Sequence, residues 1–263
     1  MIIDFHTHVF PDDIAERTVS ATLKRSGISS STDGTIQGLL NSMRNARIDI
    51  SVVSRITTRT DLVEPNNQWL LSLAQHGIAP FATMLPELKD KVGYIKRLKK
   101  QGFKGIKLHP DYQGFFVDDR RMYPFYEEAQ TEGVPILFHA GMDRGLPPPL
   151  HSTPKRLLKI HNEFPLLKMV AAHMGGEKGY RETEDLLLGK DIYLDTSFVL
   201  RLVPLKILER FFKKHPIERI LFGTDSPWKD QKEELEFLFS LTFLTDKDKE
   251  ILTSTNALQL LGN

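Results

Sequence analysis

Eight short runs rich in aliphatic, β-branched and aromatic residues recur along the chain, and this recurrence limits its fold more than any other feature. Most are apolar at successive positions, which is typical of strands buried on both faces of a sheet. The runs lie at residues 1–6, 49–55, 78–84, 103–109, 135–139, 167–173, 191–195 and 219–225. Segments with helical spacing lie between them or follow them, at 35–47, 94–102, 118–133, 203–215 and 246–261.

Strands that alternate with helices predict a parallel sheet covered on both faces. Eight such strands in 263 residues favour a closed (β/α)8 TIM barrel of the α/β class over an open sheet, because such barrels commonly have about 250 residues. No Gly/Ser-rich linker, low-complexity tract or internal repeat divides the sequence. We therefore expect residues 1–263 to form one barrel domain.

Two connections are longer than the usual link between a strand and a helix. The first runs from Phe10 to Asp33 and is expected to carry its own helix over the barrel mouth. The second, at 141–154, contains three consecutive prolines, and we expect it to do the same. Both are candidate lids over a binding site.

Composition excludes several classes of function. Lys and Arg number 35 and Asp and Glu 34, so the formal charge of +1 gives no electrostatic case for nucleic-acid or anionic-membrane partners. The absence of cysteine excludes disulfides, thiolate catalysis and Cys-ligated metals. No signal-peptide pattern or stretch of about 20 apolar residues is present, so a cytoplasmic protein acting on a small molecule is expected.

Titratable side chains gather where the predicted strands end, which is where a barrel of this type carries its chemistry. Five of the nine histidines lie there. The strand-end groups are His6, His8, Arg55, Lys107, His109, His139, His173, Asp195 and Asp225. His76 and His215, by contrast, are expected near helix C-termini, where the helix dipole favours partial positive charge.

The spacing of the first pair sharpens this pattern. Residues i and i+2 of a strand point to the same side, so His6 and His8 can both face the barrel axis while Phe5 and Thr7 face outward. Converging imidazoles and one carboxylate suit a divalent ion such as Zn²⁺. If one coordination position stayed open, the ion would bind water there and lower the pKa of that water toward about 7.

Each motif taken alone has a simpler interpretation. One His-x-His pair is a weak metal signal, and the turn at 223–227 could use Asp225 only to accept backbone N–H groups. The His-Met-Gly-Gly sequence at 173–176 could be a phosphate-binding turn. The combination of all three motifs with His139 is what favours a metal site.

In their order, the motifs DFHTH, GIKLHP, LFHAG, AAHMGG and LFGTDSPW resemble the amidohydrolase superfamily. The chain is most similar to the amidohydrolase-related (family 2) branch that also contains aminocarboxymuconate-semialdehyde decarboxylase. The resemblance runs from residue 2 to beyond residue 225. It implies a distorted (β/α)8 barrel with a divalent metal, usually zinc.

The resemblance also implies roles for individual residues. His6, His8, His139 and Asp225 would ligate one metal. Asp225 would also take a proton from the metal-bound water, and His173 would be a catalytic acid or base. A second metal held by His173, or by a carbamylated Lys107, stays an alternative; one metal per chain is preferred.

Three functions remain open at this stage. The preferred one is hydrolysis of an amide, lactone or other carbonyl in a carboxylate-bearing substrate, which is bound by Arg55, Lys107, His109 and Arg144. The second is non-oxidative decarboxylation of a small unsaturated or aromatic acid with the same ligands. The third is a non-catalytic metal-binding barrel. Residues 236–244 are apolar on more than one side, which suits a buried helix or a homodimer interface equally.

Overall fold

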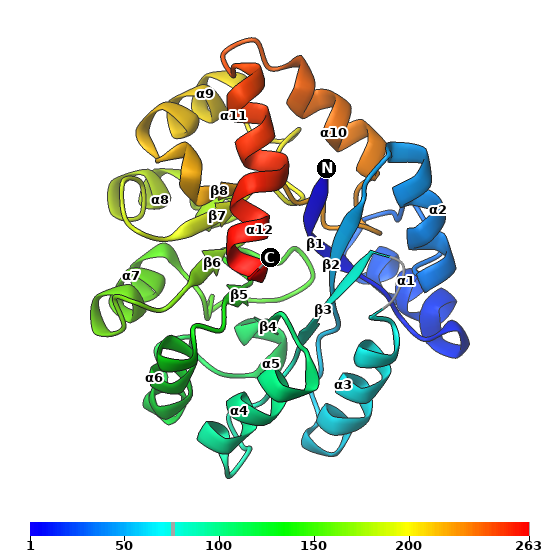
Figure 1. The fold of residues 1–263 in the computed structure, drawn as a ribbon, viewed down its shortest axis with the longest axis vertical. Coiled ribbons are helices and arrows are strands. Elements are labelled where there is room, and N and C mark those ends of the chain that lie inside the picture. Colours follow the sequence, from blue (N-terminus) through cyan, green and yellow to red (C-terminus); the bar gives the residue numbers. More distant parts are fainter. Residues whose placement is uncertain (75–76, 263) are drawn as a thin grey trace.

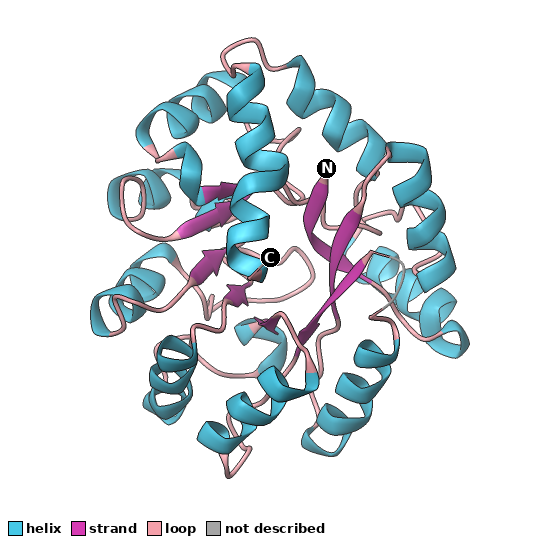
Figure 2. Cartoon of the chain, viewed as in Figure 1, coloured by secondary structure: helices cyan, strands magenta, loops and turns pink. Residues whose placement is uncertain are grey.

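The computed structural model describes residues 1–74 and 77–262, so the expectation for His76 lies outside the described residues. Eight parallel strands form one sheet in the order of the sequence, and helices surround it (Figures 1 and 2). The fold is a (β/α)8 barrel, as the eight apolar runs predict. Its strands are β1 Ile3–His8, β2 Ile50–Ser54, β3 Ile78–Ala82, β4 Gly105–Leu108, β5 Ile136–Phe138, β6 Met169–Ala171, β7 Tyr193–Asp195 and β8 Ile220–Leu221.

Most helices follow the strands in the alternating pattern. They are α1 Asp12–Ser26, α2 Ile36–Ala46, α3 Val63–Ser72, α4 Lys91–Gln101, α5 Pro110–Gln113, α6 Tyr123–Glu132, α7 Pro154–Glu163, α8 Tyr180–Leu186, α9 Leu205–Lys214, α10 Gln231–Ser240, α11 Asp246–Glu250 and α12 Asn256–Leu261. Short 3-10 turns lie at 60–62, 120–122, 173–175 and 217–219, and a π-helical turn at 251–255 joins α11 to α12.

The helix ends follow local sequence rules. The hydroxyl of Thr35 accepts the backbone N–H of Gly38 at 3.0 Å and thereby caps α2. Gly102 ends α4 in the left-handed conformation, with a φ of 101°. The first long connection carries α1, as expected. The second does not form a helix over 141–153, because three consecutive prolines remove backbone donors there.

Hydrogen bonds between β1 and the segment after β8 close the barrel. The amide of Phe5 donates to the carbonyl of Phe222 at 2.9 Å, and the amide of Asp225 donates to the carbonyl of His6 at 2.8 Å. The loop that carries Asp225 is therefore fixed directly beside the first histidine.

The expectation that Phe5 faces outward is wrong. Phe5 packs inside the barrel, edge to face with Phe81 at a centroid distance of 5.5 Å. The pairing of β1 with β2 shifts register between Asp4 and Thr7, so β1 contains an irregularity of the β-bulge kind. The extra residue lets Phe5 and His6 both face inward.

The barrel interior has an apolar floor and a polar mouth. The floor contains Phe5, Val52, Phe81 and Leu221, and α12 covers it with Ala257 and Leu260. Figure 1 shows this last helix lying across that end of the barrel. The titratable groups collect at the opposite, carboxyl-terminal ends of the strands. Within residues 1–74 and 77–262, no helix has the length and apolar character needed to cross a membrane.

Candidate metal centre

A cavity of about 460 Å³ opens at the carboxyl-terminal ends of the strands. All five strand-end histidines line it, together with Lys107 and Asp225. These side chains come from β1 and β4 and from the segments that follow β4, β5, β6 and β8, so only the closed barrel brings them together. The histidines themselves are buried, with exposures of 1% to 7%.

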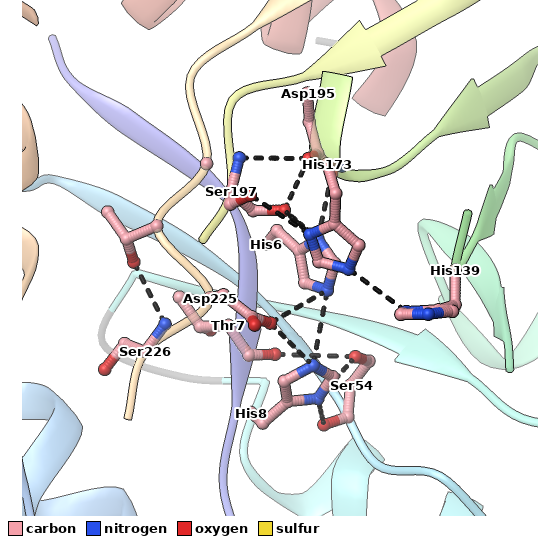
Figure 3. Close-up of polar contacts among 12 residues, drawn as sticks. His6, Thr7, His8, Ser54, His139, His173, Asp195, Ser197, Asp225 and Ser226 are labelled. Carbon is pink, nitrogen blue, oxygen red and sulfur yellow. Dashed lines mark hydrogen bonds and ion pairs between the residues drawn. The ribbon is translucent and has the colours of Figure 1, made fainter. Parts of the chain in front are cut away.

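His6, His8 and Asp225 form a compact triangle in this cavity (Figure 3). Nε2 of His6 lies 3.2 Å from Nε2 of His8, and Oδ1 of Asp225 lies 3.3 Å and 3.2 Å from these two nitrogens. The other nitrogen of each ring faces an acceptor. Nδ1 of His6 lies 2.8 Å from Oδ2 of Asp195, and Nδ1 of His8 lies 3.1 Å from the carbonyl oxygen of Ser54.

These contacts determine the neutral tautomers. A carboxylate and a carbonyl only accept, so both Nδ1 atoms carry the proton and both Nε2 atoms present lone pairs. Two lone pairs and a carboxylate oxygen then face one another at 3.2–3.3 Å. Such an arrangement is repulsive unless a positive charge lies close to the atoms. The Lys107 ammonium supplies one at Nε2 of His6, and a divalent metal would suit all three donors.

His173 and His139, which follow β6 and β5, add further imidazoles to the cavity. Nδ1 of His173 donates to the carbonyl of Ser197 at 3.0 Å, which leaves its Nε2 as an acceptor 3.1 Å from Nδ1 of His139. Nε2 of His139 is then a buried lone pair, and it has no hydrogen-bond partner among the described residues. An unsatisfied buried acceptor is costly, so this atom also fits a metal ligand, although its close His and Asp neighbours are His109 and Asp143 and not the triangle.

Two other groups of His and Asp have similar distances but carry protons where a metal would need lone pairs. One joins His6 and His173 to Asp195 through their protonated Nδ1 atoms. The other joins His109, His139 and Asp143; there His109 accepts the amide of Tyr112 on Nδ1 at 3.3 Å, so its Nε2 donates to Asp143 at 3.3 Å and only His139 offers a lone pair. The triangle around His6 is therefore the best-suited metal position of the three.

Lys107 lies on the inward face of β4. Its ammonium group is 2.9 Å from Nε2 of His6 and donates to that lone pair. Burial lowers the pKa of Lys107 to about 8, although the carboxylates of Asp195 and Asp225 oppose the shift. The lysine thus supplies positive charge at the point where the three donors converge.

Electrostatics favour unprotonated ligands in this cavity. Burial and the Lys107 charge lower the pKa of His6 to about 4, and burial holds the pKa of His139 well below its usual value. For Asp225, burial raises the pKa, but the adjacent His6 and His8 more than offset it and bring the pKa to about 2. Neutral imidazoles and an ionised carboxylate are the forms that bind metals.

Strained backbone conformations also collect at this mouth. His173, Phe198 and Asp225 all line the cavity, and their φ values are 58°, 63° and 70°. Residues other than glycine rarely adopt positive φ, and those that do concentrate at functional sites.

Sequence reasoning gave Asp195 and Ser197 no role in the site. Asp195 accepts the backbone N–H of His173 at 2.9 Å as well as Nδ1–H of His6. The Ser197 hydroxyl lies 2.9 Å from Nδ1 of both His6 and His173. Asp195 lies at the end of β7, and this position could have indicated a role in the site, because the other strand-end side chains were all assigned one.

The predicted substrate-binding residues divide into two groups. Lys107, His109 and Arg144 line the cavity, and Nε of Arg144 pairs with Glu177 at 2.9 Å. Arg55 is not among the lining residues. It donates to Asn66 at 2.6 Å, and its guanidinium lies 5.7 Å from the Trp69 ring centre.

A family model described as amidohydrolase matches residues 3–262. The chain belongs to amidohydrolase family 2. Members of this family are enzymes, either hydrolases or decarboxylases, and the His and Asp groups above could hold the metal of such an enzyme. A comparison with curated proteins finds no significant match.

Solved structures share the fold at low sequence identity. An uncharacterized TIM-barrel protein from Bordetella bronchiseptica is 20% identical, with a TM-score of 0.77 and coverage of 99% of this chain and 98% of that one. A 5-carboxyvanillate decarboxylase from Sphingomonas paucimobilis is 14% identical (TM-score 0.73, coverage 99% and 98%). A probable 2-pyrone-4,6-dicarboxylic acid hydrolase from Acinetobacter baumannii is 16% identical (TM-score 0.70, coverage 100% and 99%).

Proposed function

We propose that this amidohydrolase hydrolyses an amide, lactone or related carbonyl of a small, carboxylate-bearing substrate with the help of a divalent metal. The observation that carries the proposal is the convergence of three unprotonated donors, on His6, His8 and Asp225, inside a cavity wide enough for a small molecule. A bound divalent ion there would polarise the substrate carbonyl and acidify a water molecule.

His6, His8, His139 and Asp225 would hold the ion. Asp225 presents Oδ1 to the two histidines of β1, while Oδ2 makes no hydrogen bond within the described part of the chain. That second oxygen is suited to accept a proton from the attacking water. A carboxylate with its pKa near 2 stays ionised at neutral pH and is ready to do so.

His173 would serve the leaving group. Its ring is fixed by the Ser197 carbonyl at 3.0 Å, so Nε2 points toward His139 and the cavity. From there it can take the water proton from Asp225 and pass it to the departing atom. The substrate carboxylate would bind near Lys107, His109 and Arg144, and Arg55 would have to reorient to contribute.

A panel of lactones, amides and aromatic carboxylates tests the proposal. Purified, metal-loaded enzyme is expected to release acid from a lactone or amide without evolving CO₂. The Asp225→Asn variant should lose at least about a hundredfold in kcat, because its neutral amide cannot take the proton. The matched control is Asp230→Asn on the N-cap of α10, which should keep full turnover. Full activity of Asp225→Asn would exclude the assigned role.

Decarboxylation is the second candidate, and the fold shared with 5-carboxyvanillate decarboxylase supports it. In that reaction the same cavity residues would orient an unsaturated acid and a side chain would protonate its α-carbon. CO₂ release from an aromatic carboxylate, without hydrolysis of any lactone or amide, would establish this function instead.

The same experiments address the remaining proposals. We propose Zn²⁺ as the metal and one ion per chain, because only the triangle around His6 offers converging lone pairs among the described residues. Metal analysis of protein purified without chelator should give close to one equivalent, and clearly more would support a two-metal site. A non-catalytic barrel would instead require a metal whose coordination shell is closed to the cavity.

A further inference from the structure

One face of α1 forms part of the cavity wall. Arg17, Ala21 and Arg25 lie on it at i, i+4 and i+8, which is one stripe of a helix. Both arginines are exposed, whereas the strand-end histidines are buried. The cavity therefore runs from the candidate metal centre to an outer end with two guanidinium groups.

Apart from Lys107, the charged groups deeper in the cavity already have partners. Arg144 pairs with Glu177, Asp143 accepts from His109, and Asp225 faces His6 and His8. Across residues 1–74 and 77–262, by contrast, no carboxylate oxygen lies within 4.0 Å of the guanidinium nitrogens of Arg17 or Arg25. The outer end thus has positive charge without an internal partner.

Arg25 is held in place from two sides. Its guanidinium donates to the hydroxyl of Tyr112 and lies 4.8 Å from the centre of that ring. On the other side is Gly145 of the second long connection, where a Cβ would lie 2.5 Å from Nε of Arg25. Only one of its five N–H groups is used by Tyr112, so donors remain for a ligand.

Much of the remaining cavity lining is apolar. Phe10, Ile56, Phe198 and Trp228 contribute to it, and hydroxyl side chains such as Thr18 interrupt it. A ligand that fills the space would have an apolar body between two polar ends.

We propose that Arg17 and Arg25 bind a second carboxylate, so that the preferred substrates are small dicarboxylates with an apolar centre. The first carboxylate would lie near Lys107, and the second would lie at the α1 arginines. This inference rests on the proposed function, since the molecule bound in the cavity is taken to be the substrate.

Calorimetric binding to the metal-loaded enzyme tests the inference without turnover. The probes are the α,ω-dicarboxylates from succinate to azelate, each compared with the monocarboxylate of equal chain length. At the best length, the dicarboxylate should bind at least about tenfold more tightly, which is a gain of about 1.4 kcal/mol that one charged hydrogen bond can supply. No preference at any length would overturn the proposal.

Substitutions on α1 locate the effect. Arg17→Gln and Arg25→Gln should each reduce the dicarboxylate preference to about threefold or less, while the affinity for monocarboxylates stays unchanged. Lys24→Gln is the matched control, because Lys24 lies on the same helix turn but does not line the cavity. A preference that survives in both arginine variants, or disappears equally in the control, would contradict the assignment.

The result is separable from the proposed chemistry. If dicarboxylates bind preferentially and the preference depends on both arginines, the inference holds even when no compound is hydrolysed or decarboxylated. If turnover is found but the arginine variants bind both probe classes as the wild type does, the proposed function holds and the inference fails.

Discussion

Oδ2 of Asp195 lies 2.8 Å from Nδ1 of His6, and this contact determines which His6 nitrogen faces the cavity. The carboxylate holds the ring proton on Nδ1 and directs the lone pair of Nε2 toward His8 and Asp225. Asp195 itself is fully buried, and its other oxygen accepts from the His173 backbone at 2.9 Å. One side chain on β7 thus orients groups on β1 and in the turn that follows β6.

Asp195→Asn should therefore weaken metal binding although it removes no ligand. The amide can donate a proton to Nδ1, which favours the wrong His6 tautomer, and loss of such a partner typically costs about 10–100-fold in metal affinity. Competition with a chromogenic chelator measures the change. Asp191→Asn, at the exposed start of the same segment, is the control and should bind metal as the wild type does. Equal affinities for both variants would contradict the orienting role.

The Lys107→Met variant distinguishes two roles for the lysine: binding the substrate carboxylate as an ammonium group, or bridging two metals as a carbamate. The ammonium occupies the His6 lone pair at 2.9 Å, so its removal should leave metal affinity unchanged or raise it a few-fold while raising KM for carboxylate substrates. A carbamylated lysine that bridges two metals gives the opposite result, because the variant would then lose one metal equivalent. Metal stoichiometry and steady-state kinetics of the same preparation distinguish the two.

Much of the fold could be predicted because its signals are local. The runs of β-branched residues, the Thr35 cap and the Gly102 stop are read from neighbouring positions in the sequence. The inward position of Phe5 was missed for the opposite reason. A bulge in β1 depends on how β1 pairs with β2, and that pairing joins residues more than 40 positions apart.

The candidate site shows the same division. Strand ends predicted which histidines line the cavity, because parallel strands all end at one face of a barrel. The sequence did not indicate that Arg17 and Arg25 line it too, since the rotation of α1 over the mouth is set by tertiary contacts. Arg55 illustrates the converse: it follows β2 directly, yet Asn66 and Trp69 hold its side chain.

Glu234 on α10 should make stability depend on pH. The side chain is fully buried, and burial raises its pKa from 4.5 to about 7, reinforced by Glu233 and Asp4 and opposed by Lys229 and Arg201. Between these values the folded state binds more protons than the unfolded state. The free energy of unfolding should therefore fall as pH rises from about 4.5 to about 7.

Glu234→Gln is expected to remove this dependence and to raise the melting temperature above that of the wild type at pH 8. At pH 4 the two proteins should melt at similar temperatures, because the wild-type carboxyl group is then protonated. Glu236→Gln, which is exposed on the same helix, should follow the wild type at every pH. Identical pH profiles for Glu234→Gln and the wild type would show that Glu234 is not the titrating group.

Gly105 and Phe81 should show strong energetic coupling in the barrel floor. A Cβ on Gly105 would lie 2.4 Å from Cζ of Phe81, and the Phe81 ring cannot retreat because Phe5 packs against it at 5.5 Å. Gly105→Ala should therefore cost about 1–3 kcal/mol of unfolding free energy, the usual range for overpacking. Combining it with Phe81→Leu, which makes room, should cost less than the sum of the two single changes. If chemical denaturation gave additive losses of unfolding free energy, the added methyl group would be accommodated by other residues. The contact with Phe81 would then not be the reason for a glycine at position 105.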